Sequence, residues 1–222
     1  MDVMKLFKSF EELLYEVIVI LVFFPRTLWL TFRFPQRMMD YSDTELGDVQ
    51  SEQYSDTLSP PLFLMLCVGL GYLIERAVPG ALEDANMPVL LRNAENLVAL
   101  RVLTYSLMPL AFSLRLMHRL DIALDRDSLR PPFFSQCFAA GPVAMLEGLS
   151  QALWHAPVAN AHVFSLGITA FAIGWYLLQQ VRWLHRKLAF SYLRGAIEST
   201  VIGALTAFVA LVLSVVLIFS LV

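Results

Sequence analysis

The sequence predicts an all-α integral membrane protein: a helical bundle of five transmembrane helices preceded by an N-terminal amphipathic interfacial helix. Of the 222 residues, 58% are hydrophobic and only 16% are charged, whereas a typical soluble domain is about 45–50% apolar and about 25% charged. Five apolar stretches approach the roughly 20 residues that a helix needs to cross a hydrocarbon core. Their apolar residues are continuous and do not alternate. In lipid only helices or closed barrels satisfy the backbone, so the pattern predicts helices.

The five predicted spans fill the chain from residue 58 to its end. They cover residues 58–74, 97–114, 133–154, 161–183 and 199–222. The chain is therefore expected to divide into a cytoplasmic N-terminal region, residues 1–57, with an amphipathic helix and an acidic linker, and a five-helix transmembrane domain, residues 58–222.

The N-terminal segment has one apolar face instead of a uniform apolar surface. Its apolar residues between positions 6 and 18 recur at helical spacing, and charged residues occupy the other side. That pattern is typical of a helix that lies in the membrane surface. Pro25 is expected to break or kink it. We favour an interfacial or re-entrant segment, and a full span over residues 13–32 is the alternative.

Lys and Arg residues predict the orientation, because short cytoplasmic loops carry an excess of them. Most of the 16 Lys and Arg residues precede the first predicted span or follow the second and the fourth. The other side holds Arg76, Arg92 and Arg101. We therefore expect a multi-pass protein of the cell (inner) membrane with a cytoplasmic N-terminus.

An acidic stretch without any Lys or Arg leads into the first span. Its carboxylates are Asp40, Asp43, Glu45, Asp48, Glu52 and Asp56. We expect a solvated tether here, and a docking segment for a basic partner is the alternative.

Two charged residues, Glu147 and Arg101, lie well inside predicted spans and away from their cytoplasmic ends, where charges are costly and often functional. Glu147 and Arg101 both lie in the outer halves of their helices by the helical rise of about 1.5 Å per residue. We expect a structural ion pair between them. The alternatives are a Glu147 carboxylate that lines a polar cavity or proton path, or one that reaches the interface.

Small residues recur every four positions on the third and fifth spans, as at close contacts between membrane helices. They are Ala140, Ala144 and Gly148, then Gly195, Ser199, Gly203 and Ala207. We expect these helix-packing faces to lie inside the bundle or between protomers.

No catalytic constellation is evident in the sequence, so an enzyme is not expected. Asp121, Asp125 and Asp127 are close together, which allows Mg²⁺ binding, but a salt-bridged helix end is the favoured interpretation. We expect no catalytic residues, no metal and no cofactor. The net charge of −3 and the absence of a basic tract argue against a nucleic-acid partner.

The entry to the first span carries Asp56, Leu58, Pro60 and Pro61. With a cytoplasmic N-terminal region and five spans, this resembles the Yip family, whose eukaryotic members enter the first span through Asp-Leu followed by Gly-Pro. The stretch from Pro25 to Pro35 looks more like the bacterial branch, whose members are often described as permeases or as membrane proteins of unknown function. The resemblance implies a five-span membrane fold.

The function expected from these features is a non-enzymatic scaffold or accessory subunit of a membrane complex or of a membrane-trafficking or envelope process. The alternative is a permease or channel component that moves a small solute or lipid. The expected partners are membrane lipid and other membrane proteins, including further copies of this chain.

Overall fold

The computed structural model describes residues 3–47, 49, 53–79 and 92–220. The described residues form helices and no strand, which confirms the all-α prediction. The helices are α1 (Val3–Arg33), α2 (Pro35–Glu45), α3 (Pro60–Arg76), α4 (Ala94–Arg119), α5 (Arg126–His155), α6 (Ala161–Leu188) and α7 (Tyr192–Ser220).

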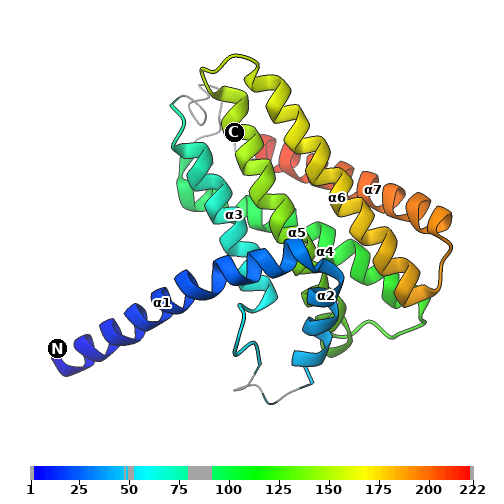
Figure 1. Ribbon diagram of the computed structural model, residues 1–222, viewed down its shortest axis with the longest axis horizontal. Helices are drawn as coiled ribbons and strands as arrows, with labels where there is room; N and C mark the ends of the chain where they lie inside the picture. Colours follow the sequence, from blue (N-terminus) through cyan, green and yellow to red (C-terminus); the bar gives the residue numbers. More distant parts are fainter. Residues whose placement is uncertain (1–2, 48, 50–52, 80–91, 221–222) are drawn as a thin grey trace.

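Helix α5 forms the centre of the bundle. It packs against α2, α3, α4 and α6, and α7 covers α4 and α6. Large side chains such as Phe112, Phe138 and Trp183 are fully buried between these helices. The α4–α5 and α6–α7 connections lie at one end of the bundle, and the α5–α6 connection lies at the other (Figure 1).

The number of spans differs from the prediction. Four helical segments are long and apolar enough to cross a membrane: Phe7–Arg33, Ala94–Arg119, Ala161–Leu188 and Tyr192–Val216. The expected arrangement of five spans plus an interfacial helix is therefore wrong, because the N-terminal helix qualifies while α3 and α5 do not. Helix α3 has only 17 residues. Helix α5 is surrounded by other helices and buries polar residues such as Ser135 and Gln136 in place of lipid-facing apolar ones.

The helix does not break at Pro25 as predicted, and it ends at a later position. Helix α1 continues through Pro25 to Arg33, and the chain leaves the helical conformation at Phe34, with φ of −136°. Pro35 then occupies the start of α2. Because proline disfavours the helical conformation of the residue before it and fits the first turn of a helix, Pro35 separates the two helices.

The two halves of α1 have different surroundings. The C-terminal half buries Thr27 and Thr31 completely, and Phe24 packs against Phe63 of α3 with ring centroids 5.8 Å apart. The N-terminal half extends away from the bundle (Figure 1), and its apolar side chains, such as Phe7 and Phe10, are exposed. It has the exposed apolar surface of a segment whose environment is lipid or another chain.

The start of the acidic stretch is a docked helix and not a solvated tether. Helix α2 buries Met38 and Met39 against the bundle, and the Ser135 hydroxyl donates to the Met39 carbonyl at 2.7 Å. Asp40 pairs with Arg186, and Asp43 accepts from Lys187 at 2.8 Å.

Burial raises the pKa of the Asp43 carboxyl, and Lys187 opposes that rise. Met39 and residues after 57 belong to one apolar core, so the expected boundary at 57 does not separate the packing of the two regions. Asp48 and Glu52 lie outside the described residues.

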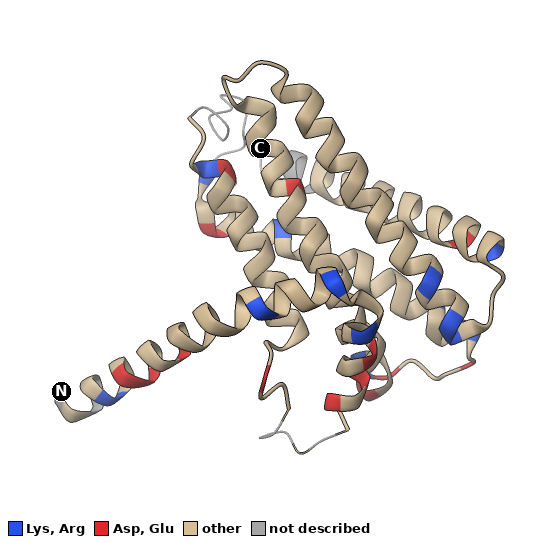
Figure 2. Ribbon diagram, in the orientation of Figure 1, with Lys and Arg blue, Asp and Glu red and all other residues tan. Residues whose placement is uncertain are grey.

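Basic residues gather at the end of the bundle where α4 and α6 end and where α5 and α7 begin (Figure 2). We call this the basic end, defined by Arg115, Arg119, Arg126, Arg130, Arg182, Arg186, Lys187 and Arg194. The opposite end carries the α5–α6 connection and the C-terminus of α3.

Candidate functional site

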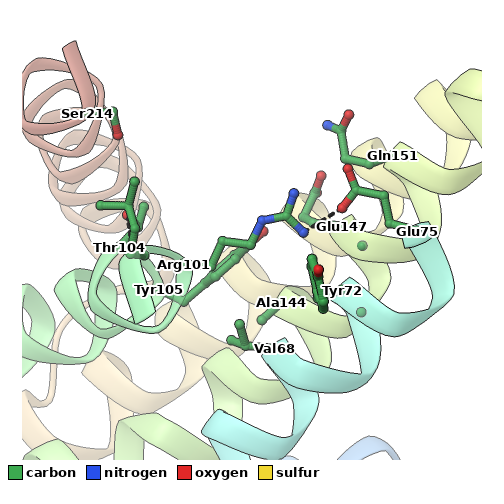
Figure 3. Close-up of a pocket in the computed structure, with 13 residues that line it drawn as sticks. Val68, Tyr72, Glu75, Arg101, Thr104, Tyr105, Ala144, Glu147, Gln151 and Ser214 are labelled. Atoms are coloured by element: carbon green, nitrogen blue, oxygen red, sulfur yellow. Dashed lines mark hydrogen bonds and ion pairs between the residues drawn. The ribbon is translucent and has the colours of Figure 1, made fainter. Parts of the chain in front are cut away.

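A polar cavity of about 300 Å³ opens between α3, α4 and α5, away from the basic end. Figure 3 shows Arg101 reaching from α4 toward Glu75 of α3, with Glu147 and Gln151 of α5 beside them. Tyr72 and Tyr105 supply aromatic walls. Three helices thus bring charged, amide and phenol groups to one place.

A close approach of α3 and α5 positions the two carboxylates. A Cβ on Gly148 would lie 2.4 Å from the Gly71 Cα, and a Cβ on Gly71 would lie 3.2 Å from the Ala144 carbonyl oxygen. The two backbones therefore touch, and a side chain on Gly148 would overlap the backbone of Gly71. Glu75 lies one turn beyond Gly71, and Glu147 directly precedes Gly148, so the contact sets both at the cavity.

Arg101 has a different partner from the one predicted. Its Nη1 donates to the Glu75 Oε2 at 2.5 Å, and the Glu75 side chain is only 5% exposed. The Arg101 guanidinium carbon also lies 5.9 Å from the centroid of the Tyr72 ring. The ion pair of Arg101 is thus made with Glu75 and not with Glu147, although all three residues line the same cavity.

Glu147 is half-buried and accepts a hydrogen bond from the Thr169 hydroxyl at 3.2 Å. That hydroxyl lies 2.8 Å from the Ser150 hydroxyl, which lies 2.8 Å from the Ser165 hydroxyl. This chain of hydroxyls joins α5 to α6 and holds the carboxylate in place. Among the described residues, Glu147 makes no ion pair with Lys, Arg or His.

The charges of the cavity do not balance. Glu75 and Arg101 neutralise each other, and the Glu147 carboxylate remains. A half-buried carboxylate without a cation either takes up a proton or attracts a positive group. The arrangement is therefore suited to bind an ammonium or another small cation, and Arg101 retains N–H donors for an accompanying anion.

The predicted small-residue faces lie at helix contacts. Ala140, Ala144 and Gly148 are buried on α5, and on the α7 face Gly195 approaches Val181 of α6. Gly203 likewise faces Leu177, and Ser199 is fully buried, whereas Ala207 is exposed and borders an apolar groove between α4, α5, α6 and α7.

The span-entry motif ties α3 to α1. Asp56 pairs with Arg26 at 3.2 Å and accepts from the Tyr41 hydroxyl at 2.6 Å. The backbone N–H of Leu58 donates to the Thr27 hydroxyl at 3.2 Å. Pro60 and Pro61 then begin α3. In this structure the motif anchors the start of α3.

A second charged cluster at the basic end was missed by the sequence analysis. Glu198 of α7 accepts from Arg115 and Arg119 of α4, each at 2.7 Å, and lies 3.7 Å from Arg194. Glu198 and Glu75 each fall one residue outside a predicted span. The spacing of four between Arg194 and Glu198 was the available signal, because such pairs face each other on a helix.

The acidic cluster before α5 forms a helix cap. The Asp125 carboxylate accepts from the backbone N–H groups of Ser128 at 2.8 Å and Asp127 at 2.9 Å. These bonds lower the pKa of Asp125. Nowhere in the described part of the chain do three His, Cys, Asp or Glu residues come together as metal ligands.

The fold and the cavity define the class of protein: its four apolar helices indicate a multi-pass helical membrane protein, and it holds a charged cavity inside the bundle. No family model, no curated protein and no solved structure matches this chain.

Proposed function

We propose that this protein binds a small cationic or zwitterionic group within the membrane and acts as a permease or channel component. The observation that carries the proposal is the Glu147 carboxylate, which makes no ion pair among the described residues although it lines the same cavity as the paired Arg101 and Glu75. A charge at such a depth is expensive to maintain and typically marks a ligand or ion site.

The other walls of the cavity suit the same kind of ligand. The faces of Tyr72 and Tyr105 attract cations, and the Gln151 amide offers both a donor and an acceptor. A volume of about 300 Å³ is at the lower limit of the roughly 300–1,000 Å³ typical of small-molecule sites. These features favour a ligand of few heavy atoms, or the polar part of a larger one.

The proposed orientation rests on the basic end. Since cytoplasmic loops are rich in Lys and Arg, we place the α4–α5 and α6–α7 connections in the cytoplasm of a cell with this protein in its inner membrane. The cavity then opens toward the opposite side of the membrane. Yip-family membership, suggested by residues 56–61, is part of the same proposal.

Choline is a suitable first probe because it is a small ammonium ion. Ligand binding raises the unfolding temperature of the protein that binds it, so thermal unfolding in mild detergent is measured with and without choline. We expect choline to stabilise the natural protein and the Glu12→Gln variant, whose altered side chain is exposed on α1, but not Glu147→Gln. Equal stabilisation of Glu147→Gln would reject the proposal.

A scaffold or accessory role is the second candidate, supported by the N-terminal half of α1. Its exposed side chains Phe7, Phe10 and Leu14 are available to a partner within the membrane. Copurification in mild detergent with and without residues 3–18 tests this role. A stoichiometric protein that is lost with the deletion supports the scaffold, and an unchanged composition argues against it.

A further inference from the structure

An apolar groove of about 330 Å³ lies next to the polar cavity. Helices α4, α5, α6 and α7 line it, and its walls include Met108, Val143, Ile173, Leu177, Ala204 and Ala207. Tyr105 lines both the groove and the cavity. The Tyr105 side chain is therefore a wall that the two spaces share.

The groove continues the cavity along the helices toward the basic end. On α4, Arg101 lines the cavity and Met108 lines the groove, which are about 10 Å apart along the axis at about 1.5 Å per residue. On α5, Glu147 lines the cavity and Val143 lines the groove. The polar part thus lies nearer the membrane surface and the apolar part nearer the middle of the bundle.

We propose that the occupant of the joined site is a glycerophospholipid with an ammonium-bearing zwitterionic headgroup. The inference rests on the proposed function and names the ligand class of that same site. The ammonium pairs with Glu147, the phosphate accepts from the N–H groups of Arg101 that Glu75 leaves free, and one acyl chain lies in the groove. The polar walls lie nearer the membrane surface than the apolar walls do, which matches the order of headgroup and acyl chain in a lipid of that leaflet.

Other occupants use only part of the site. A free small cation leaves the groove unfilled, and a lipid without an ammonium offers nothing to Glu147. A partner helix covers the groove without using the charges of the cavity. Only an amphiphile carrying both charges satisfies the carboxylate, the guanidinium and the apolar walls together.

Two variants test the contact with the headgroup and the contact with the acyl chain separately. Glu147→Gln removes the partner of the ammonium. Ala207→Trp fills the groove from a residue that is exposed on α7 and lies away from the cavity. Val209→Trp is its matched control, because Val209 is 46% exposed on the same helix and does not line the groove.

The full chain in detergent is titrated with short-chain phosphatidylethanolamine, short-chain phosphatidylglycerol and chain-free phosphoethanolamine, with bound ligand counted by native mass spectrometry. We expect phosphatidylethanolamine to bind the natural protein and Val209→Trp at least about tenfold more tightly than either other ligand, a difference of about 1.4 kcal/mol. We expect Ala207→Trp to lose that advantage over phosphoethanolamine, and Glu147→Gln to lose binding of both ammonium ligands.

The outcomes distinguish the two proposals. If phosphoethanolamine binds through Glu147 as tightly as the lipid does, the lipid inference fails and the proposed function stands. If phosphatidylglycerol binds as tightly as phosphatidylethanolamine, the headgroup assignment is overturned. If no ammonium ligand binds, both proposals fail. Thermal unfolding of each variant without ligand identifies any loss that comes from misfolding.

Discussion

Helix α4 carries two arginine–carboxylate clusters, and they differ in how their charges balance. At the basic end, Glu198 is surrounded by Arg115, Arg119 and Arg194. In the cavity, the single guanidinium of Arg101 faces two carboxylates and pairs with one of them. The same residue types thus form a saturated cluster in one place, and in the other they leave one carboxylate without an ion pair among the described residues.

The comparison shows that a charged residue within the helical bundle does not by itself identify a site. Glu198 joins α7 to α4 at the basic end, and its arginines are partly exposed, so any excess positive charge is solvated. Glu147 is fixed by a neutral hydroxyl chain instead. The Thr169 hydroxyl donates to this carboxylate without balancing its charge.

The largest expected effect on stability comes from disrupting the cluster around Glu198. Glu198→Gln leaves Arg115 and Arg119 facing each other without their shared carboxylate. Breaking a buried pair costs about 3–5 kcal/mol, and partial exposure of the arginines reduces this, so we expect a loss of about 2 kcal/mol in thermal or denaturant unfolding. Glu12→Gln is the matched control. A loss no larger than that of the control contradicts the structural role of Glu198.

Smaller changes in stability are expected in the cavity, and they differ between its two carboxylates. Glu75→Gln leaves the Arg101 guanidinium without its carboxylate partner. The free energy of unfolding should fall by about 1–2 kcal/mol. Glu147→Gln removes a charge that has no ion-pair partner among the described residues and should leave stability unchanged or slightly higher. Unfolding of both variants in the same detergent, without ligand, measures the difference. Equal losses for the two variants contradict the assignment of Glu75 as the partner of Arg101.

Much of the fold could be predicted from the sequence, because continuous apolar stretches define α4, α6 and α7. The docking of α2 could not, since it depends on ion pairs between Asp40 or Asp43 and bases that lie in the final turn of α6. The continuity of α1 through Pro25 also depends on packing, because the bundle holds the residues that follow the proline.

The candidate site was predicted in part. Glu147 and Arg101 were identified because both lie inside apolar stretches, and the structure brings both to one cavity. The pairing of Arg101 with Glu75 was not predictable, because it depends on how α3 packs against α5 at the contact between Gly71 and Gly148. Glu75 was missed because its helix continues past the apolar residues that defined the predicted span.

The smallest expected effect concerns a carboxylate that lies in water. Asp125 caps α5 through backbone N–H groups and is fully exposed, and these bonds lower its pKa. A lowered pKa in the folded state means that the charged form stabilises the fold above the unfolded pKa of about 3.9. That contribution disappears as the pH falls through the lower, folded value.

Asp125→Asn keeps a side-chain oxygen that caps the helix and removes only the charge. We expect the natural protein to unfold at a slightly higher temperature than Asp125→Asn at pH 7, because a negative charge at the start of a helix is favourable. The difference should shrink as the pH is lowered through about 4 and should also decrease with added salt. A difference that stays constant between pH 7 and pH 3 would show that the Asp125 charge contributes nothing. The stabilisation by the solvent-exposed Asp125 charge could then not be compared with that of the two charged clusters of α4.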